Sequence, residues 1–160
     1  MGLTIDQFAE LVGSNRSMIQ RVETGAKSPT IDLLTEIANV CRKPMIEFLG
    51  EEPPQFLKYS LETQKKILGM NHEVIIIGPY GLLSSNMVVN LFRGETGGVV
   101  KPQTHKGYCW VYIIKGVCVF EHDGTPHELK AGDSIYYDAS KSQTLKIISA
   151  LESIRITIRE

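Results

Sequence analysis

The feature that most constrains the fold is a change in the spacing of apolar residues about one third of the way along the 160-residue chain. Between residues 4 and 49, apolar side chains recur every three or four positions, as on one face of a helix. After "GEEPPQ" at residues 50–55, short β-branched runs such as "EVIIIG" and "SIRITI" alternate with turn residues. A helical part followed by an all-β barrel or sandwich is therefore predicted.

These textures predict a helical domain over residues 1–50, a linker and bridging helix or strand over 51–71, and a β domain over 72–160. The net charge of -1 excludes a strongly basic, non-specific nucleic-acid binder, so any contact with DNA must rest on a local patch. The sequence has no long apolar run and no basic leader. Its three cysteines are an odd number, and they are not spaced in pairs. We expect a soluble, cytoplasmic protein with reduced thiols and no membrane partner.

Helix starts can be read from the capping residues of the first part. Thr4 with Gln7 forms a capping box, Ser14 or Asn15 can cap the next helix, and Thr30 can cap a third. Helices are expected to stop at the glycines Gly13, Gly25 and Gly50.

The first two helices carry the packing pattern of a DNA reader. Ala9 lets two helices approach closely, Gly13 makes the turn, and Ile19 with Val22 seals the second helix onto the first. The segment "TIDQFAELVGSNRSMIQRVETG" thereby resembles the λ-repressor-like helix-turn-helix of the XRE family, and the likeness continues to "EFLG".

The resemblance implies that double-stranded DNA is a partner. It makes Arg16, Ser17 and Arg21 the residues that reach base edges. Phosphate contacts are expected from Thr4, Ser14, Asn15, Gln20, Thr24 and Lys27. The alternative is that Arg16, Arg21 and Lys27 are only exposed charges on the surface of a helical bundle. Between Gly13 and Lys43, five basic residues face three acidic ones, so we expect two copies to bind a palindromic operator together.

Domains of this family place another helix before the one that begins here at Thr4, and the first helix is apparently missing. Phe8, Leu11, Ile37 and Phe48 are therefore expected to be partly uncovered, each forgoing roughly 1.5 to 3 kcal/mol of burial.

The second part resembles a small cupin domain, a double-stranded β-helix or jelly-roll barrel that follows a helix-turn-helix in many bacterial regulators. The likeness runs from about residue 72 to 158 and rests on "LKAGDSIYYDAS" and on "YIIKG". The metal-ligand positions of that family fall here on Gln103, His105, Cys109 and Gln143, and His105 is the one match. We therefore expect no metal cofactor, with a soft ion at these positions as the minor alternative.

Two uses of the barrel are left open as nearly equal alternatives: a cavity for a small organic effector, and a filled barrel that serves only as a dimer interface. The residues expected to line the cavity are Gln103, His105, Cys109, Val111, Ile113, Tyr137, Gln143 and Leu145, with Met87 and Leu91 as further candidates. Cys109 could be a redox-sensing thiol, but we favour the interpretation that it is an unreactive part of the core.

Together these features predict a homodimeric transcriptional regulator that is not an enzyme. Two rivals remain open at this point: an iron-dependent epoxidase of the same architecture, and a protein-interaction module with a degenerate pocket.

Overall fold

The computed structural model describes residues 2–52, 54–78, 80–81, 86–102 and 104–159 of the chain. They form two compact units, one with the described residues up to Gln55 together with Gly81, and the other with the described residues of 56–80 and from Asn86 onward. The first unit is helical and the second is a β-sheet, as the apolar spacing predicts.

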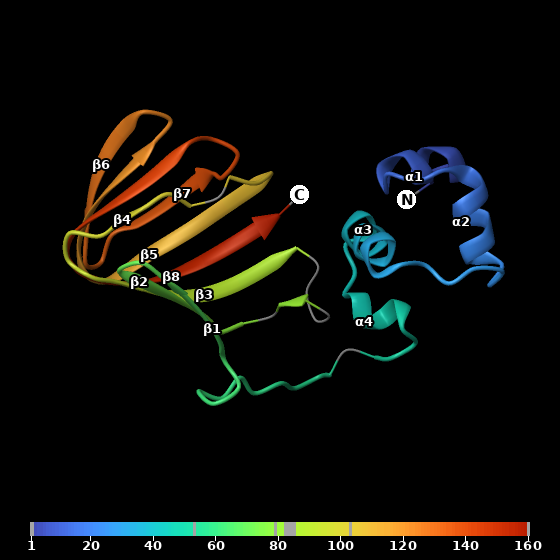
Figure 1. The fold of residues 1–160 in the computed structure, drawn as a ribbon, viewed down its shortest axis with the longest axis horizontal. Helices are drawn as coiled ribbons and strands as arrows, with labels where there is room; N and C mark the ends of the chain where they lie inside the picture. Colours follow the sequence, from blue (N-terminus) through green and yellow to red (C-terminus); the bar gives the residue numbers. More distant parts are fainter. Residues whose placement is uncertain (1, 53, 79, 82–85, 103, 160) are drawn as a thin grey trace. The chain divides into compact units, whose positions relative to one another are not determined.

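The helical unit has four helices in its described part. Side-chain oxygens accept backbone N–H groups at the start of the three longer ones, from Thr4, Asn15 and Thr30. Asn15 rather than Ser14 thus caps the second helix. The helices are α1 (Ile5–Leu11), α2 (Arg16–Glu23), α3 (Ile31–Cys41) and α4 (Met45–Phe48), drawn in blue to cyan in Figure 1.

Four buried residues, Ala9, Val12, Ile19 and Ile37, form the core of this unit. Ala9 is only 2% exposed, and Gly13 adopts a φ of 63°, a left-handed conformation that glycine reaches at little cost. The tight turn that the sequence predicts between the first two helices is therefore confirmed.

The expectation that Ile37 is partly uncovered is wrong. Its side chain is 8% exposed because it packs against the buried side chains of Ala9, Val12 and Ile19. Leu11 and Phe48 are exposed, as expected, and Phe8 is half-buried.

In its described part the second unit is an eight-stranded antiparallel sheet with the order β1-β2-β3-β8-β5-β6, in which β4 pairs with β8 and β7 pairs with β5. Figure 1 shows the long strands β3, β8 and β5 side by side. Strand β1 lies within the segment 51–71, for which the sequence predicts a linker with a bridging element. The strands are β1 (Lys65–Gly69), β2 (His72–Ile76), β3 (Met87–Gly94), β4 (Val99–Val100), β5 (Gly107–His122), β6 (Thr125–Lys130), β7 (Ser134–Asp138) and β8 (Gln143–Arg159).

Irregular pairing bends the two longest strands. The register between β5 and β8 shifts between Ile113 and Cys118, where Gly116 has a φ of 92° and a Cβ would collide with the Ala150 carbonyl oxygen. Beyond the bend β5 changes partner, since residues 108–112 pair with β7 and residues 117–122 with β6. The sheet is thereby curled around a core that includes Cys109, Ile113, Cys118, Phe120 and Ile147.

Candidate nucleic-acid interface and ligand cavity

Helix α2 presents a polar face to solvent. Arg16, Ser17, Gln20 and Arg21 are exposed, whereas Ile19 is 2% exposed and packs into the helical unit. A helix that is held by one face and offers long polar side chains on the other has the form that enters a major groove.

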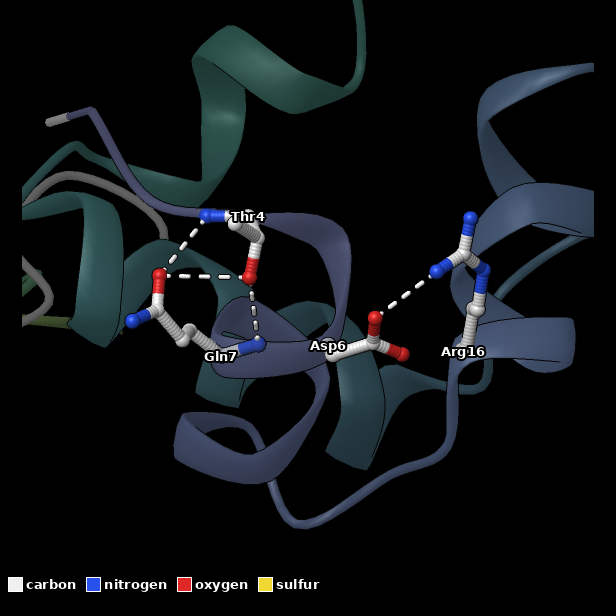
Figure 2. Close-up of polar contacts among 4 residues, drawn as sticks. All are labelled: Thr4, Asp6, Gln7 and Arg16. Atoms are coloured by element: carbon white, nitrogen blue, oxygen red, sulfur yellow. Dashed lines mark hydrogen bonds and ion pairs between the residues drawn. The ribbon is translucent and has the colours of Figure 1, made fainter.

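Figure 2 shows that Arg16 donates from Nη1 to Oδ2 of Asp6 in α1 across 2.7 Å. The two side chains are 57% and 62% exposed, so water screens the ion pair and it stabilises the fold by about 1 kcal/mol at most. Its larger consequence is electrostatic, because Asp6 offsets part of the positive charge that Arg16 brings to this surface.

Two residues for which phosphate contacts are predicted are occupied in helix capping. The Thr4 hydroxyl accepts the Gln7 backbone N–H while the Thr4 backbone N–H donates to Gln7 Oε1, as Figure 2 shows. Asn15 Oδ1 accepts the Met18 backbone N–H across 2.9 Å. These side chains hold the helices in place, and any contact with phosphate must share them.

The remaining predicted residues divide into two groups. Ser14 is half-buried, and the Thr24 hydroxyl donates to the Gln20 carbonyl oxygen across 2.9 Å. The side chains of Gln20, Arg21 and Lys27 are exposed and have no polar partner among the described residues. These last three are the side chains most available to DNA.

The curled sheet of the second unit encloses a cavity of about 660 Å³. The sequence-predicted residues that line it are His105, Val111, Ile113, Tyr137 and Leu145. The volume lies within the range of small-molecule sites, so the cavity is large enough for an organic ligand.

Four other residues predicted for the cavity, Cys109, Gln143, Met87 and Leu91, do not line it. Cys109 and Gln143 are buried in the wall, at 0% and 6% exposure, and are not part of the lining. Met87 and Leu91 are on the face of β3 opposite Asn90 and Phe92, which do line the cavity, because successive side chains in a strand alternate. Gln103 lies outside the described residues.

The donor groups near His105 do not fit a divalent metal ion. Its Nε2 lies 3.6 Å from Cys109 Sγ, but Arg155 donates to the same sulfur across 3.3 Å and brings a fixed positive charge. The Gln143 amide nitrogen is bonded to the Ala139 carbonyl oxygen. Among the described residues, no group of three or more His, Cys, Asp or Glu side chains could hold a metal.

Arg155 is the site residue that the sequence interpretation missed. Burial opposes its charge, yet the neighbouring Tyr137 and Cys109 hold the pKa of its guanidinium above the usual range. Burial likewise raises the pKa of the Tyr137 phenol well above its usual range. Burial also raises the pKa of Cys118 to about 11, so that thiol stays protonated at neutral pH.

The signal for Arg155 is present in the run "SIRITI". Its polar members Ser153, Arg155 and Thr157 line the cavity, and its isoleucines therefore face outward. An alternating strand is usually read with the apolar side inward, and here the opposite assignment is correct.

The outward side chains of four neighbouring strands, β3, β8, β5 and β7, form an apolar surface, here called the outer face. Trp110 stands opposite Ile156 and Tyr112 opposite Ile154 in the strand register. The Trp110 and Tyr112 rings stack with centroids 6.2 Å apart. The outer face comprises Met87, Val89, Leu91, Tyr108, Trp110, Tyr112, Tyr136, Ile154, Ile156 and Ile158.

Comparison with protein families gives one match within each unit. A family model described as a helix-turn-helix, HTH_3, matches residues 1–48, and a second described as a cupin domain, Cupin_2, matches residues 90–150. No curated protein sequence matches the chain. No helix in the part of the chain that the structure describes is long and apolar enough to cross a membrane.

Several solved structures share the fold. The hydroxypropylphosphonic acid epoxidase from S. wedmorenis is 12% identical, with a TM-score of 0.57 over 98% of this chain and 90% of that one. An HTH_3 family transcriptional regulator from Vibrio cholerae is 19% identical, with a TM-score of 0.50 over 99% and 89%. An RmlC-like cupin from Shewanella frigidimarina is 14% identical, with a TM-score of 0.56 over 68% and 96%. At these identities the likeness establishes the fold alone.

Proposed function

Because the chain joins an HTH_3 helix-turn-helix domain to a Cupin_2 cupin domain, we propose that it is a sequence-specific transcriptional regulator that binds double-stranded DNA through α2. The observation that carries this proposal is the exposed polar face of α2, held to its unit by the buried Ile19.

Arg21 is the residue best placed to read a base. Its guanidinium is exposed and unpaired within the described residues, and arginine binds guanine through two parallel hydrogen bonds. Arg16 reads a second base only after it exchanges its partner Asp6 for DNA. Ser17 lies between them in the sequence of the same helix, and its hydroxyl can form a hydrogen bond with either a donor or an acceptor on a base edge.

The modest local charge makes a dimer necessary. With a net charge of -1 and few unpaired cations on the helical unit, one copy has little electrostatic affinity for phosphate at physiological salt. Two copies on a palindromic operator combine two weak contacts into one strong one.

We propose that the outer face of the cupin domain forms the dimer interface with a second copy. It has the anatomy of such an interface, with aromatic residues at its centre and a charged edge. At that edge, in the same outward register, Arg93 donates to Glu152 across 3.1 Å and to Glu73 across 3.2 Å. A two-fold pairing of this surface also matches the symmetry of a palindromic operator.

The cavity then serves as the sensor. A small effector shifts the equilibrium between the DNA-competent and the incompetent arrangement only if it binds the two with different affinity.

We propose no catalysis, because the residues around His105 do not fit a metal and the epoxidase is similar in fold alone. A regulator of this kind acts on the chromosome, so the cytoplasm is its proposed location.

Selection of binding sites from random duplexes tests this function. The full chain is expected to enrich one inverted repeat whose half-sites are about one helical turn apart. Recovery of unrelated sequences would count against the proposal.

The Asp6→Asn variant is expected to bind random duplex more tightly, by roughly fivefold or about 1 kcal/mol at low salt. The substitution frees Arg16 and removes a negative charge from the surface that faces phosphate. Fluorescence anisotropy at several salt concentrations measures the effect. The Glu51→Gln variant, in the exposed segment after α4, is the control for loss of one negative charge and should change affinity much less. Unchanged affinity in Asp6→Asn would remove this region from the interface.

A further inference from the structure

We propose that the cavity of the cupin domain binds a small organic acid whose carboxylate is held by Arg155. Only the statement that this acid is the effector of the regulator rests on the proposed function. Binding itself is a property of the cavity and can be measured without DNA.

The position of Arg155 aims it at the cavity. It stands in β8 opposite Asn90 in β3 and Val111 in β5, and all three residues line the cavity. Its neighbours in the same inward row, Ser153 and Thr157, are buried polar residues of the lining. A carboxylate at Arg155 therefore finds hydroxyl donors on both sides along the strand.

The charge of Arg155 lacks a carboxylate partner among the described residues. One terminal nitrogen donates to Cys109 Sγ across 3.3 Å, and the buried Nε has no hydrogen-bond partner. Cys109 and Tyr137, the neighbours that favour its charged form, supply no carboxylate. An anion in the cavity would supply the charged acceptor with which a guanidinium forms its strongest hydrogen bonds.

The rest of the lining favours a negative ligand as well. Lys101 and Arg159 also line the cavity, and the described lining contains no aspartate or glutamate. The electrostatic potential inside the cavity is therefore positive, which attracts anions and repels cations.

The apolar walls decide between an organic acid and an inorganic anion. Large side chains including Phe92, Ile113, Leu145 and Leu151 face the same space, and they favour a ligand with an apolar body. Guanidinium binds a carboxylate through charge-assisted hydrogen bonds, so the acid group is expected at Arg155 and the body against these walls.

Calorimetric titration of the full chain with benzoate and with benzamide, its neutral isostere, tests the inference. Benzoate is expected to bind at least about tenfold more tightly than benzamide. The Arg155→Gln variant should bind the two equally. Lys130→Gln, which removes an exposed positive charge from β6 outside the cavity lining, is the matched control and should keep the wild-type preference. Equal binding to the wild type, or a preference that survives in Arg155→Gln, overturns the inference.

A stability measurement separates ligand binding from a structural role. Arg155→Met removes a charge that has no carboxylate partner among the described residues, and if Arg155 serves to bind an anion the ligand-free variant should melt no lower than the wild type. A lower melting temperature would instead make Arg155 part of the fold. Operator affinity is measured separately, so failure of anion binding leaves the DNA-binding proposal intact, and the reverse also holds.

Discussion

The Trp110→Glu variant is expected to be a monomer and to bind operator DNA at least about 100-fold more weakly than the wild type. Trp110 lies at the centre of the outer face, stacked on Tyr112 and opposite Ile156. In a two-fold dimer the substitution places two carboxylates in an apolar interface, where each unpaired charge costs several kcal/mol. Separated copies lose the gain in affinity that comes from binding two half-sites together.

Sedimentation equilibrium of wild type and variant measures the change directly. Phe56→Glu is the matched control, since Phe56 is 85% exposed and is not part of the outer face. The control should remain dimeric and keep its affinity for the operator. A wild type that sediments as a monomer, or a Trp110→Glu variant that remains a dimer, would show that the outer face has another use.

The Arg21→Ala variant is expected to lose about 1 to 3 kcal/mol of binding free energy at each half-site and to accept any base at the position that Arg21 reads. The reason is that an alanine leaves the guanine edge without its two hydrogen bonds. Because the operator has two half-sites, the loss in the dimer is roughly twice that at one. Titrations against duplexes with each base substituted in turn measure both the loss and the relaxed preference.

Lys27→Ala provides the contrast, because Lys27 is exposed and expected to contact phosphate alone. This variant should bind all duplexes more weakly to the same extent. The slope of log affinity against log salt concentration should become smaller by about 1, as expected for the loss of one phosphate contact. If Arg21→Ala gives the same uniform loss, Arg21 contacts the backbone and does not read sequence.

The helical unit was largely predictable because its signals are local. Thr4 and Thr30 cap helices by bonding residues three positions ahead, and Gly13 ends a helix in a conformation that other residues reach at a cost. Ile37 was misjudged because its burial depends on contacts with Ala9 and Ile19, which lie far from it in the sequence. The partnership of Asp6 with Arg16 has no such local signature, and ten positions separate the two residues.

The cavity was predicted less well because its walls come from strands that are distant in sequence. Counting along a strand fixes which residues share a face but leaves open which face is inside. In the run "SIRITI" of β8 the polar residues face inward and the isoleucines outward, which is the reverse of the usual assignment. Arg155, the main polar group of the cavity, belongs to this inward set. Cys109 and Gln143 are on strands that border the cavity, but both are buried and neither is among the residues that line it.

The central claim is that α2 reads a DNA sequence, and an anisotropy titration in rising salt tests it most directly. The full chain is titrated with its selected inverted repeat and with a scrambled duplex of the same length. The account predicts that the repeat binds at least about 1,000-fold more tightly at physiological salt, and that a large part of this ratio survives as salt rises. Equal affinity for both duplexes at every salt concentration would contradict it.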